Sequence, residues 1–214
     1  MIQTLKNALK IKEIRSRILF TFFILVVVRI GCQFPVPGVN HSVVSNFMKS
    51  NTGDAFNFFN AITGGSFADF SLFALNITPY ITASIIMQLL TIAIPKLEEL
   101  QKDGEDGRKV IAQITRYVTV ALALIESIAM AIGFGNQGLF KHYNWHSVVL
   151  CVATLTAGSA ILMWLGERIT EKGVGNGISV VLLINIISAL PGDLMTLYER
   201  FIQSASVAMK VVSV

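Results

Sequence analysis

Long apolar stretches alternate with short polar segments along the chain. Residues 70–95, 147–166 and 173–192 carry no charged side chain, and residues 18–34 carry only Arg29. A helix needs about 20 consecutive apolar residues to cross the hydrocarbon core of a bilayer. The pattern therefore predicts five membrane-spanning helices, at residues 18–34, 76–95, 110–134, 147–166 and 177–191.

The composition agrees with a membrane protein. Hydrophobic residues make up 53% of the 214 residues and charged residues only 14%, whereas soluble domains carry about 25% charged residues. A soluble enzyme, a disordered chain and a nucleic-acid-binding protein are therefore excluded. The apolar run from Ile18 is too long for a cleavable signal peptide. Residues 1–17, where apolar residues alternate with lysines, predict an amphipathic helix on the membrane surface.

Lysine and arginine residues are concentrated on one side of the predicted membrane domain. Segments 1–17, 96–116 and 166–176 carry twelve of them, whereas the segments on the opposite side carry four. Because these residues accumulate in cytoplasmic loops, we expect the amino terminus and its amphipathic helix in the cytoplasm. Five spans then make residues 192–214 an external segment, which would lead to a sixth span that this chain lacks.

The first external segment, residues 35–75, is more apolar than a loop in water. It is rich in phenylalanine and is interrupted at Gly64–Gly65, which weakens a continuous helix. A short half-helix that re-enters the protein at membrane depth fits this pattern, and an external hairpin packed on lipid headgroups is the alternative. The chain breaks again before the second span, where we expect Thr78 to cap the helix and Pro79 to occupy its first turn. Membrane proteins that handle a substrate often contain such broken helices.

Known motifs of enzymatic or metal chemistry are absent from the sequence. There is no His-Glu-x-x-His, Gly-x-Ser-x-Gly or Cys-x-x-Cys motif, so we expect no catalytic residue, cofactor or metal. Glu126 is a functional candidate, because an acid inside a membrane span is costly. Gln88, a polar residue within the second span, needs a polar partner. The glycine-rich run at 173–177 predicts a tight turn in which Asn176 caps the fifth span.

Several of these stretches, taken in order, resemble the SecY family, whose members form the central subunit of the protein-conducting channel. The matching segments are residues 29–31 (RIG), 35–38 (PVPG), 73–90 (FALNITPYITASIIMQLL), 103–109 (DGEDGRK), 163–167 (MWLGE) and 173–179 (GVGNGIS). The resemblance covers almost the whole chain. It implies an all-α membrane fold in which ten spans form an inverted repeat of five and five. This chain resembles the amino-terminal half, so the resemblance implies the carboxyl-terminal half or a second copy as its partner.

The resemblance also implies three functional regions, for each of which ordinary helix packing is the alternative. The first is a mobile plug at residues 57–71 that closes the external side, with candidate residues Phe58, Phe59, Gly64, Gly65, Phe67 and Asp69. The second is one side of a lateral gate on spans 2 and 3, with candidates Thr82, Ile85, Gln88, Leu89, Ile92 and Glu126. The third is an apolar pore ring, to which Ile77, Ile81, Ile178 and Leu182 align. Four of the gate residues recur at helical spacing, and Asp69 is expected to face water.

The function implied by the resemblance is non-enzymatic. We expect passage of unfolded secretory polypeptides across the plasma membrane of a prokaryote and sideways release of signal and transmembrane helices into lipid. The implied partners are SecE-like and SecG-like small subunits, a SecA-type motor ATPase or a ribosome, signal peptides and membrane lipids. A secondary transporter with a small-solute site at the broken helices is an alternative, as is a scaffolding half without transport of its own.

Overall fold

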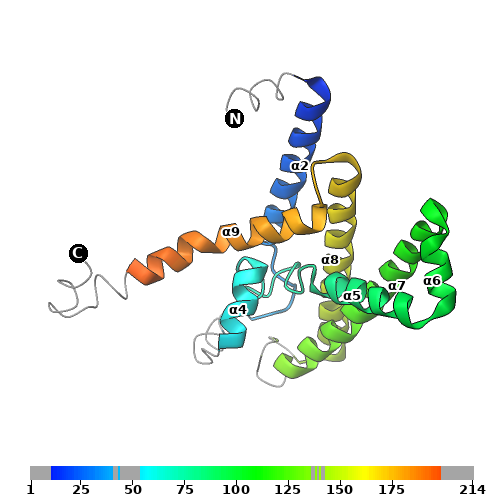
Figure 1. The fold of residues 1–214 in the computed structure, drawn as a ribbon. Helices are drawn as coiled ribbons and strands as arrows, with labels where there is room; N and C mark the ends of the chain where they lie inside the picture. Colours follow the sequence, from blue (N-terminus) through cyan, green and yellow to red (C-terminus); the bar gives the residue numbers. More distant parts are fainter. Residues whose placement is uncertain are drawn as a thin grey trace, which may run out of the picture.

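Helices form every regular element in the part of the chain that the structure describes. The structure is a computed structural model, and it describes residues 11–40, 43, 54–135, 138, 140 and 143–198, without the side chains of 54–57, 193, 196 and 197. Its helices are α2 (Lys12–Gly31), α4 (Asp54–Thr63), α5 (Thr78–Ala93), α6 (Pro95–Lys102), α7 (Gly104–Gly135), α8 (Trp145–Lys172) and α9 (Gly177–Tyr198) (Figure 1). The predicted all-α fold is confirmed.

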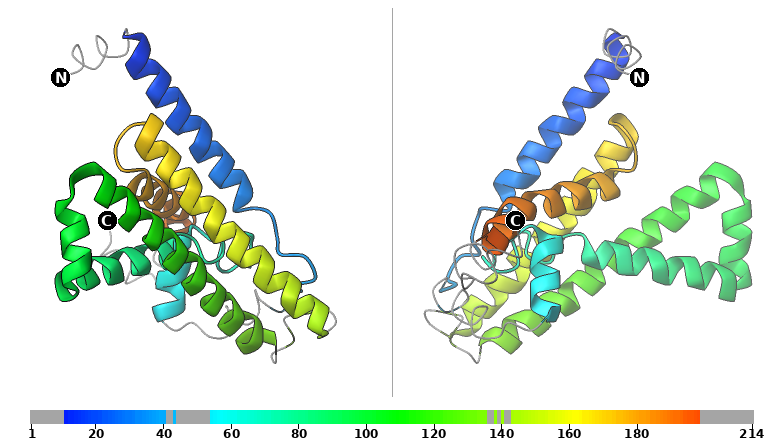
Figure 2. Two further views of the ribbon diagram at one scale, coloured as in Figure 1. Left: turned by 90° about the vertical axis from the view of Figure 1, so that its right-hand side faces the viewer. Right: turned by 60° about the vertical axis from the view of Figure 1, so that its left-hand side comes forward.

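Helices α7 and α8 form a long antiparallel pair, with α2 alongside α8 (Figure 2). Both helices of the pair are long and apolar enough to cross a membrane. The buried positions of α7 recur mostly every four residues and are small: Gly107, Thr115, Thr119, Ala123, Ser127, Ala131 and Gly135. Small side chains let helix backbones approach closely. The hydroxyls of Ser127 and Thr156 also form a hydrogen bond of 2.9 Å between the two helices.

Helices α5 and α6 meet at a bend of 102°. Ile94 is extended, with φ −111° and ψ 112°, and Pro95 lies in the first turn of α6. The bend follows from proline, which has no N–H and disfavours the helical region for the residue before it. Counted as one span, the pair is a third candidate for crossing the membrane. Gly107 lies near the start of α7, where a Cβ would collide with the Leu100 carbonyl of α6.

Helices α2 and α9 correspond to the first and fifth predicted spans. α2 begins at Lys12 and ends at Gly31, so it joins part of the predicted amino-terminal helix to the first span. Among the described residues, length and composition alone identify two membrane-crossing helices, or three with the bent pair; the apolar part of α9, Gly177–Gly192, is shorter. The five-span topology therefore stays a prediction. Residues 1–10 and 199–214, which contain most of the two predicted terminal segments, lie outside the described residues.

The two predicted helix caps have different outcomes. The Asn176 side chain accepts the N–H groups of Ile178 at 3.0 Å and Ser179 at 3.4 Å, so the predicted cap of α9 is confirmed. The prediction that Thr78 caps α5 is wrong, because Ile77 occupies the N-cap position without a side-chain hydrogen bond. Proline near the start of α5 explains why the helix tolerates the lack of a side-chain cap, since proline removes one of the N–H groups that a cap would satisfy.

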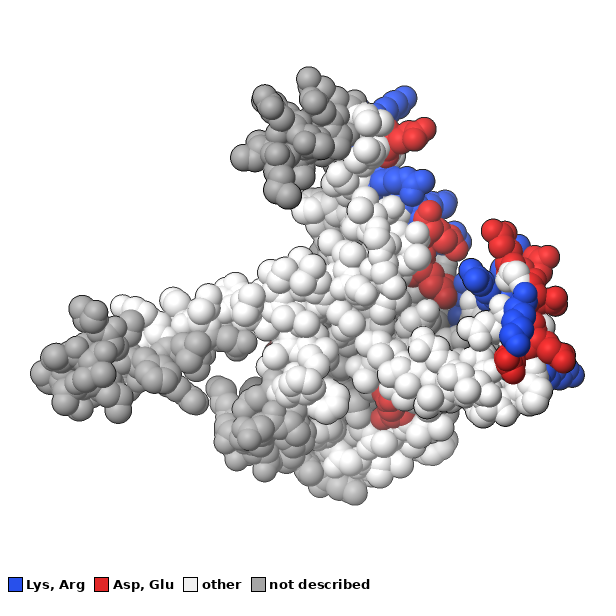
Figure 3. Space-filling model, viewed as in Figure 1, with Lys and Arg blue, Asp and Glu red and all other residues white. Residues whose placement is uncertain are grey.

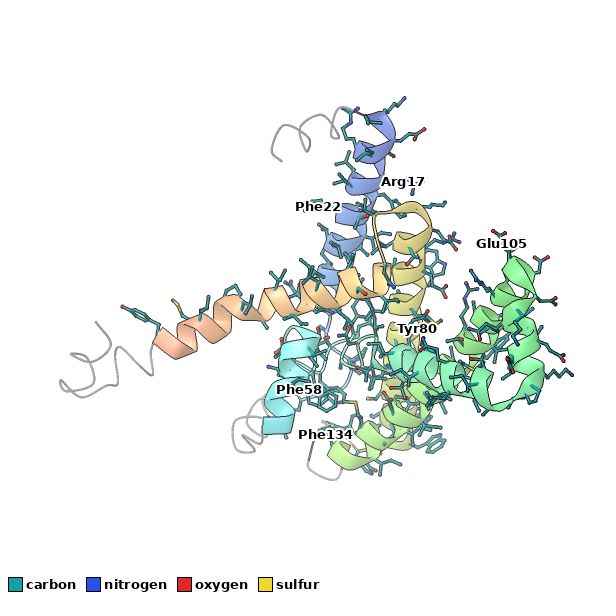
Figure 4. All side chains as sticks on the ribbon, in the orientation of Figure 1. Arg17, Phe22, Phe58, Tyr80, Glu105 and Phe134 are labelled. Atoms are coloured by element: carbon teal, nitrogen blue, oxygen red, sulfur yellow. The ribbon has the colours of Figure 1, made fainter. Side chains whose placement is uncertain are left out.

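Charged side chains gather at one end of the molecule. They cover the start of α2, the end of α8, α6 and the start of α7 (Figure 3). Arg17 and Glu105 mark this end in Figure 4, whereas Phe58 and Phe134 lie toward the other end. The ion pairs here include exposed helical pairs such as Lys102–Glu98 at 2.6 Å, which stabilise a fold by only about 0–1 kcal/mol each. The charges therefore mark a water-facing surface more than they hold the helices together.

Candidate functional site

A tight turn joins the short helix α4 to the segment that leads into α5. Because α4 ends at Thr63, the predicted half-helix over residues 57–71 is shorter than expected. Gly64 and Gly65 follow with φ angles of 63° and 90°, a left-handed conformation in which glycine avoids the Cβ penalty. The Thr63 hydroxyl accepts the N–H of Phe67 at 3.2 Å. The glycine pair therefore interrupts the helix as the sequence predicted, and its role as a flexible joint of a plug stays a prediction.

The segment after this turn is fixed between α8 and the chain that leaves α2. Leu72 donates its N–H to the Phe34 carbonyl at 2.8 Å, and Val36 donates to the Phe70 carbonyl at 3.1 Å. Phe70 is fully buried. A Cβ at Gly158 of α8 would overlap the Leu72 carbonyl, so the backbones touch there. These contacts set the positions of both α4 and the start of α5.

The aromatic residues of the predicted plug lie partly on the surface. Phe58 is 63% exposed and Phe59 is 45% exposed. The Phe59 ring lies 6.3 Å from that of Phe58 and 6.1 Å from that of Phe67, centroid to centroid. Asp69 is exposed, as expected for an acid that is costly to bury. α4 therefore presents an apolar surface that this chain covers only in part.

A largely apolar pocket of about 420 Å³ separates the α4 region from α7. Phe59, Phe67, Met130 and Phe134 are among the residues that line it. Glu126 lines the same pocket, so the structure brings this acid beside the predicted plug and away from the other gate residues. Sequence spacing could not show this placement, because it depends on which distant segments come to line the same cavity in the fold.

Five predicted gate residues form an exposed stripe along α5. Ile85, Leu89 and Ile92 are 53%, 62% and 79% exposed, and Thr82 and Gln88 are exposed with them. Pro79, Ala83, Met87 and Thr91 form the buried face of the same helix. The contacts of α5 with other helices are mostly with α7 and α6. Ile85 and Gln88 also line a pocket that the ring residues Ile81 and Ile178 share.

The predicted ring residues lie where α5 and α9 begin. Ile77 is completely buried in a cluster with Leu162 and Val181, and Ile81 and Ile178 pack against this cluster. Leu182 is half-buried one turn further along α9. The structure therefore brings three of the four residues together. In this arrangement Ile77 supports the cluster from inside, while Ile81 and Ile178 reach its surface.

Sequence reasoning missed two polar features near the ring. Ile81 and Ile178 line a pocket of about 500 Å³ that also holds the ion pair between Arg116 and Glu167, with 2.8 Å from Nε to Oε1. The second feature is Asn185, which is 1% exposed in the middle of α9. A polar residue inside a charge-free apolar stretch is the signal that could have identified it.

The described part of the chain holds no group of three or more His, Cys, Asp or Glu residues that could bind a metal ion. Cys32 and Cys151 are buried free cysteines. The side chains that the structure does bring together are mainly apolar, with isolated polar contacts.

Comparison with known proteins identifies a family. A family model described as SecY matches residues 71–214. Proteins named protein translocase subunit SecY are similar along most of the chain. The relative from Halalkalibacterium halodurans is 43% identical over 208 residues, covering 96% of this chain and 48% of the relative. The Pseudomonas aeruginosa relative is 45% identical over 181 residues (85% and 41% covered), and that from Bacillus subtilis is 41% identical over 227 residues (100% and 52% covered).

The chain spans about half the length of the curated relatives it matches. Two solved structures share its fold, one of Sec61 in the canine ribosome-channel complex from the endoplasmic reticulum and one of a protein-conducting channel. Each gives a TM-score of 0.57 at 20% identity and covers 88% of this chain and 38% of that chain. At this identity the likeness concerns the fold, and it agrees with the fold that the sequence predicted.

Proposed function

The chain belongs to the SecY family, and on this premise we propose that it forms the amino-terminal half of a protein-translocation channel. Such a channel passes unfolded secretory polypeptides across the plasma membrane of a prokaryote. The observation that carries the proposal is α4 with its glycine turn. This ten-residue helix is followed by a reversal at Gly64 and Gly65 and by a segment fixed against α8. A short helix whose end lies against the middle of α9 and is hydrogen-bonded by Asn76, just before α5, suits a plug better than a loop in water.

The ring residues supply the apolar wall of the proposed passage. Ile81, Ile178 and Leu182 present apolar side chains from α5 and α9, and buried Ile77 supports them. A narrow apolar constriction loses water easily, which blocks ions while binding no particular peptide side chain. The carboxyl-terminal half of the channel, or a second copy of this chain, supplies the remaining wall.

The exposed stripe on α5 supports a lateral gate. Ile85, Leu89 and Ile92 offer a continuous apolar surface, and a hydrophobic signal helix recognises such a surface by its own apolar face. Thr82 and Gln88 add polar groups on the exposed side of α5. A signal peptide therefore leaves the passage along α5 and enters lipid. Glu126 and α7 complete this side of the gate next to the plug.

Orientation and partners follow from the charges. The charged end of the molecule (Figure 3) faces the cytoplasm, together with the amino terminus, because Lys and Arg prefer that side. A SecA-type motor ATPase or a ribosome delivers the polypeptide from there. SecE-like and SecG-like subunits and membrane lipids cover the apolar outer faces of the helices.

A small-solute transporter receives less support. A solute site needs several polar groups that converge on one cavity. The Asn76 side chain is engaged inside the protein by Asn185 and by the Ile62 carbonyl. Thr78 and Glu126 instead face a pocket whose other walls are largely apolar.

Reconstitution tests the proposal. The chain is placed in liposomes with a motor ATPase and a secretory precursor, with and without the carboxyl-terminal half of a SecY relative. We expect protease-protected precursor only when both halves are present. The relative's own two halves serve as the positive control. Lack of import by the mixed pair, with the control active, or efficient import by this chain alone would contradict the half-channel proposal.

A further inference from the structure

A chain of polar side chains, two of them buried asparagines, connects α2, α9 and α4. Asn185 of α9 donates to the Asn76 side-chain oxygen at 3.1 Å, and Arg29 of α2 donates to the Asn185 side-chain oxygen at 3.3 Å. Asn76 in turn donates to the Ile62 carbonyl of α4 at 3.2 Å. Both asparagines are 1% exposed. Three hydrogen bonds thus run from the first helix, through two amides 109 residues apart in the sequence, to the last turn of α4.

These contacts satisfy groups that would otherwise be costly to bury. The Ile62 carbonyl belongs to the last turn of α4, where a helix leaves carbonyls without a partner in the helix. Asn76 has a φ angle of 52°, a conformation that asparagine tolerates better than most residues. Each amide uses its acceptor for one neighbour and its donor for the next. The pair is therefore directional, unlike the apolar packing around it.

The end of α4 also fits closely against the other members of this chain. A Cβ at Gly64 would lie 2.8 Å from Nη1 of Arg29 and 2.7 Å from the Asn185 carbonyl oxygen. The arginine therefore lies directly beside Gly64, the residue that follows α4. A positive charge is favourable near the C-terminal end of a helix, because the carbonyl ends of its peptide dipoles point there.

We propose that Asn76 and Asn185, positioned by Arg29, form a polar latch that holds the end of α4 against α9. The inference rests on the proposed function, in which α4 is the plug. The latch then determines how readily the plug leaves its closed position. The apolar contacts of α4 lack direction and leave Phe58 and Phe59 partly exposed. The hydrogen bonds of the latch therefore select one position of the helix.

The rate at which a disulfide forms between positions 32 and 66 measures how often α4 occupies its closed position, without relying on transport. Ser66, in the turn after α4, lies beside the Cys32 thiol, and both residues are buried. The variant Ser66→Cys is prepared with Cys32 retained and Cys151→Ala. It is expressed as the full chain together with the other channel subunits. The rate of disulfide formation is measured in membrane vesicles under a mild oxidant.

Replacing the latch residues is expected to slow disulfide formation. Asn185→Leu removes the hydrogen bonds to Asn76 and Arg29 with a side chain of similar volume. Asn76→Gly removes the side-chain amide, and glycine adopts the left-handed backbone conformation of this position without strain. Hydrogen bonds between membrane helices correspond to about a 3- to 20-fold change in an equilibrium. We expect a fall of this size in each variant and no further fall in the double variant. Ser127→Ala, which removes a buried contact between α7 and α8, should leave the rate unchanged.

The outcomes separate the latch from the plug. Unchanged disulfide rates in the asparagine variants, with normal protein levels, overturn the latch. If Asn185→Leu lowers the protein level, the disulfide rate of the Asn76→Gly variant alone decides whether the latch exists. Slower disulfide formation without any added ion leak supports the latch but contradicts the role of α4 as a plug. Slower formation together with a leak supports both.

Discussion

Replacing Phe59 with alanine tests whether α4 seals the proposed passage. Phe59 is 45% exposed, so about half of its side chain is buried against the α4 pocket and its neighbours. Complete burial of a phenylalanine stabilises by about 1.5–3 kcal/mol, so this half contributes about 0.8–1.5 kcal/mol. The ring contact with Phe67 at 6.1 Å adds about 0.5–1.5 kcal/mol.

Phe59→Ala is therefore expected to destabilise the closed position of α4 by about 2 kcal/mol. This corresponds to about a 30-fold increase in the population of channels in which α4 has left that position. The assay measures chloride or potassium leak through channels reassembled with a carboxyl-terminal half in planar bilayers. Phe22→Ala is the matched control, because Phe22 is 64% exposed on α2 and does not line this pocket (Figure 4). Phe58→Ala, at a ring that is 63% exposed, should give a smaller leak. If channels with Phe59→Ala leak as little as channels with Phe22→Ala at equal protein levels, the reasoning that α4 seals the passage is refuted.

Three further predictions concern the ring, the topology and the packing of α8. Changing Ile81, Ile178 and Leu182 together to serine, with Ile77 kept for stability, should produce a persistent ion leak and relaxed signal-sequence stringency in reassembled channels. The control Ile187→Ser, on the exposed side of α9, should produce neither effect. Membranes that stay sealed with the triple variant would count against the ring. In intact cells, an impermeant thiol reagent should label a cysteine at residue 142 but not one at residue 104, and the reverse pattern would rule out the orientation. Gly158→Leu should strongly reduce the amount of folded protein, because a Cβ there overlaps the Leu72 carbonyl; normal levels in a membrane fraction would show that this close contact is dispensable.

Local chemistry explains what the sequence predicted correctly. Apolar stretches long enough to span a bilayer become helices, because a backbone inside the membrane must satisfy its own hydrogen bonds. Asn176 caps α9 because its side chain reaches N–H groups only two and three residues away. The reversal at Gly64 and Gly65 is equally local, since it depends on the absence of a Cβ. Each of these features is decided within a few residues of the chain.

Contacts between distant segments decided the rest. Glu126 borders the α4 pocket because residues of α4 and α7 line the same cavity, and Gly107 lies against α6 because of the bend at Pro95. Thr78 failed as a cap although its residue type suited the position, since the cap site fell on Ile77. The pairing of Asn76 with Asn185 joins residues 109 positions apart, and no local pattern selects one buried partner among several. Sequence periodicity specifies which residues form helices, whereas the match of side-chain volumes and hydrogen-bonding groups between helices specifies which of them meet.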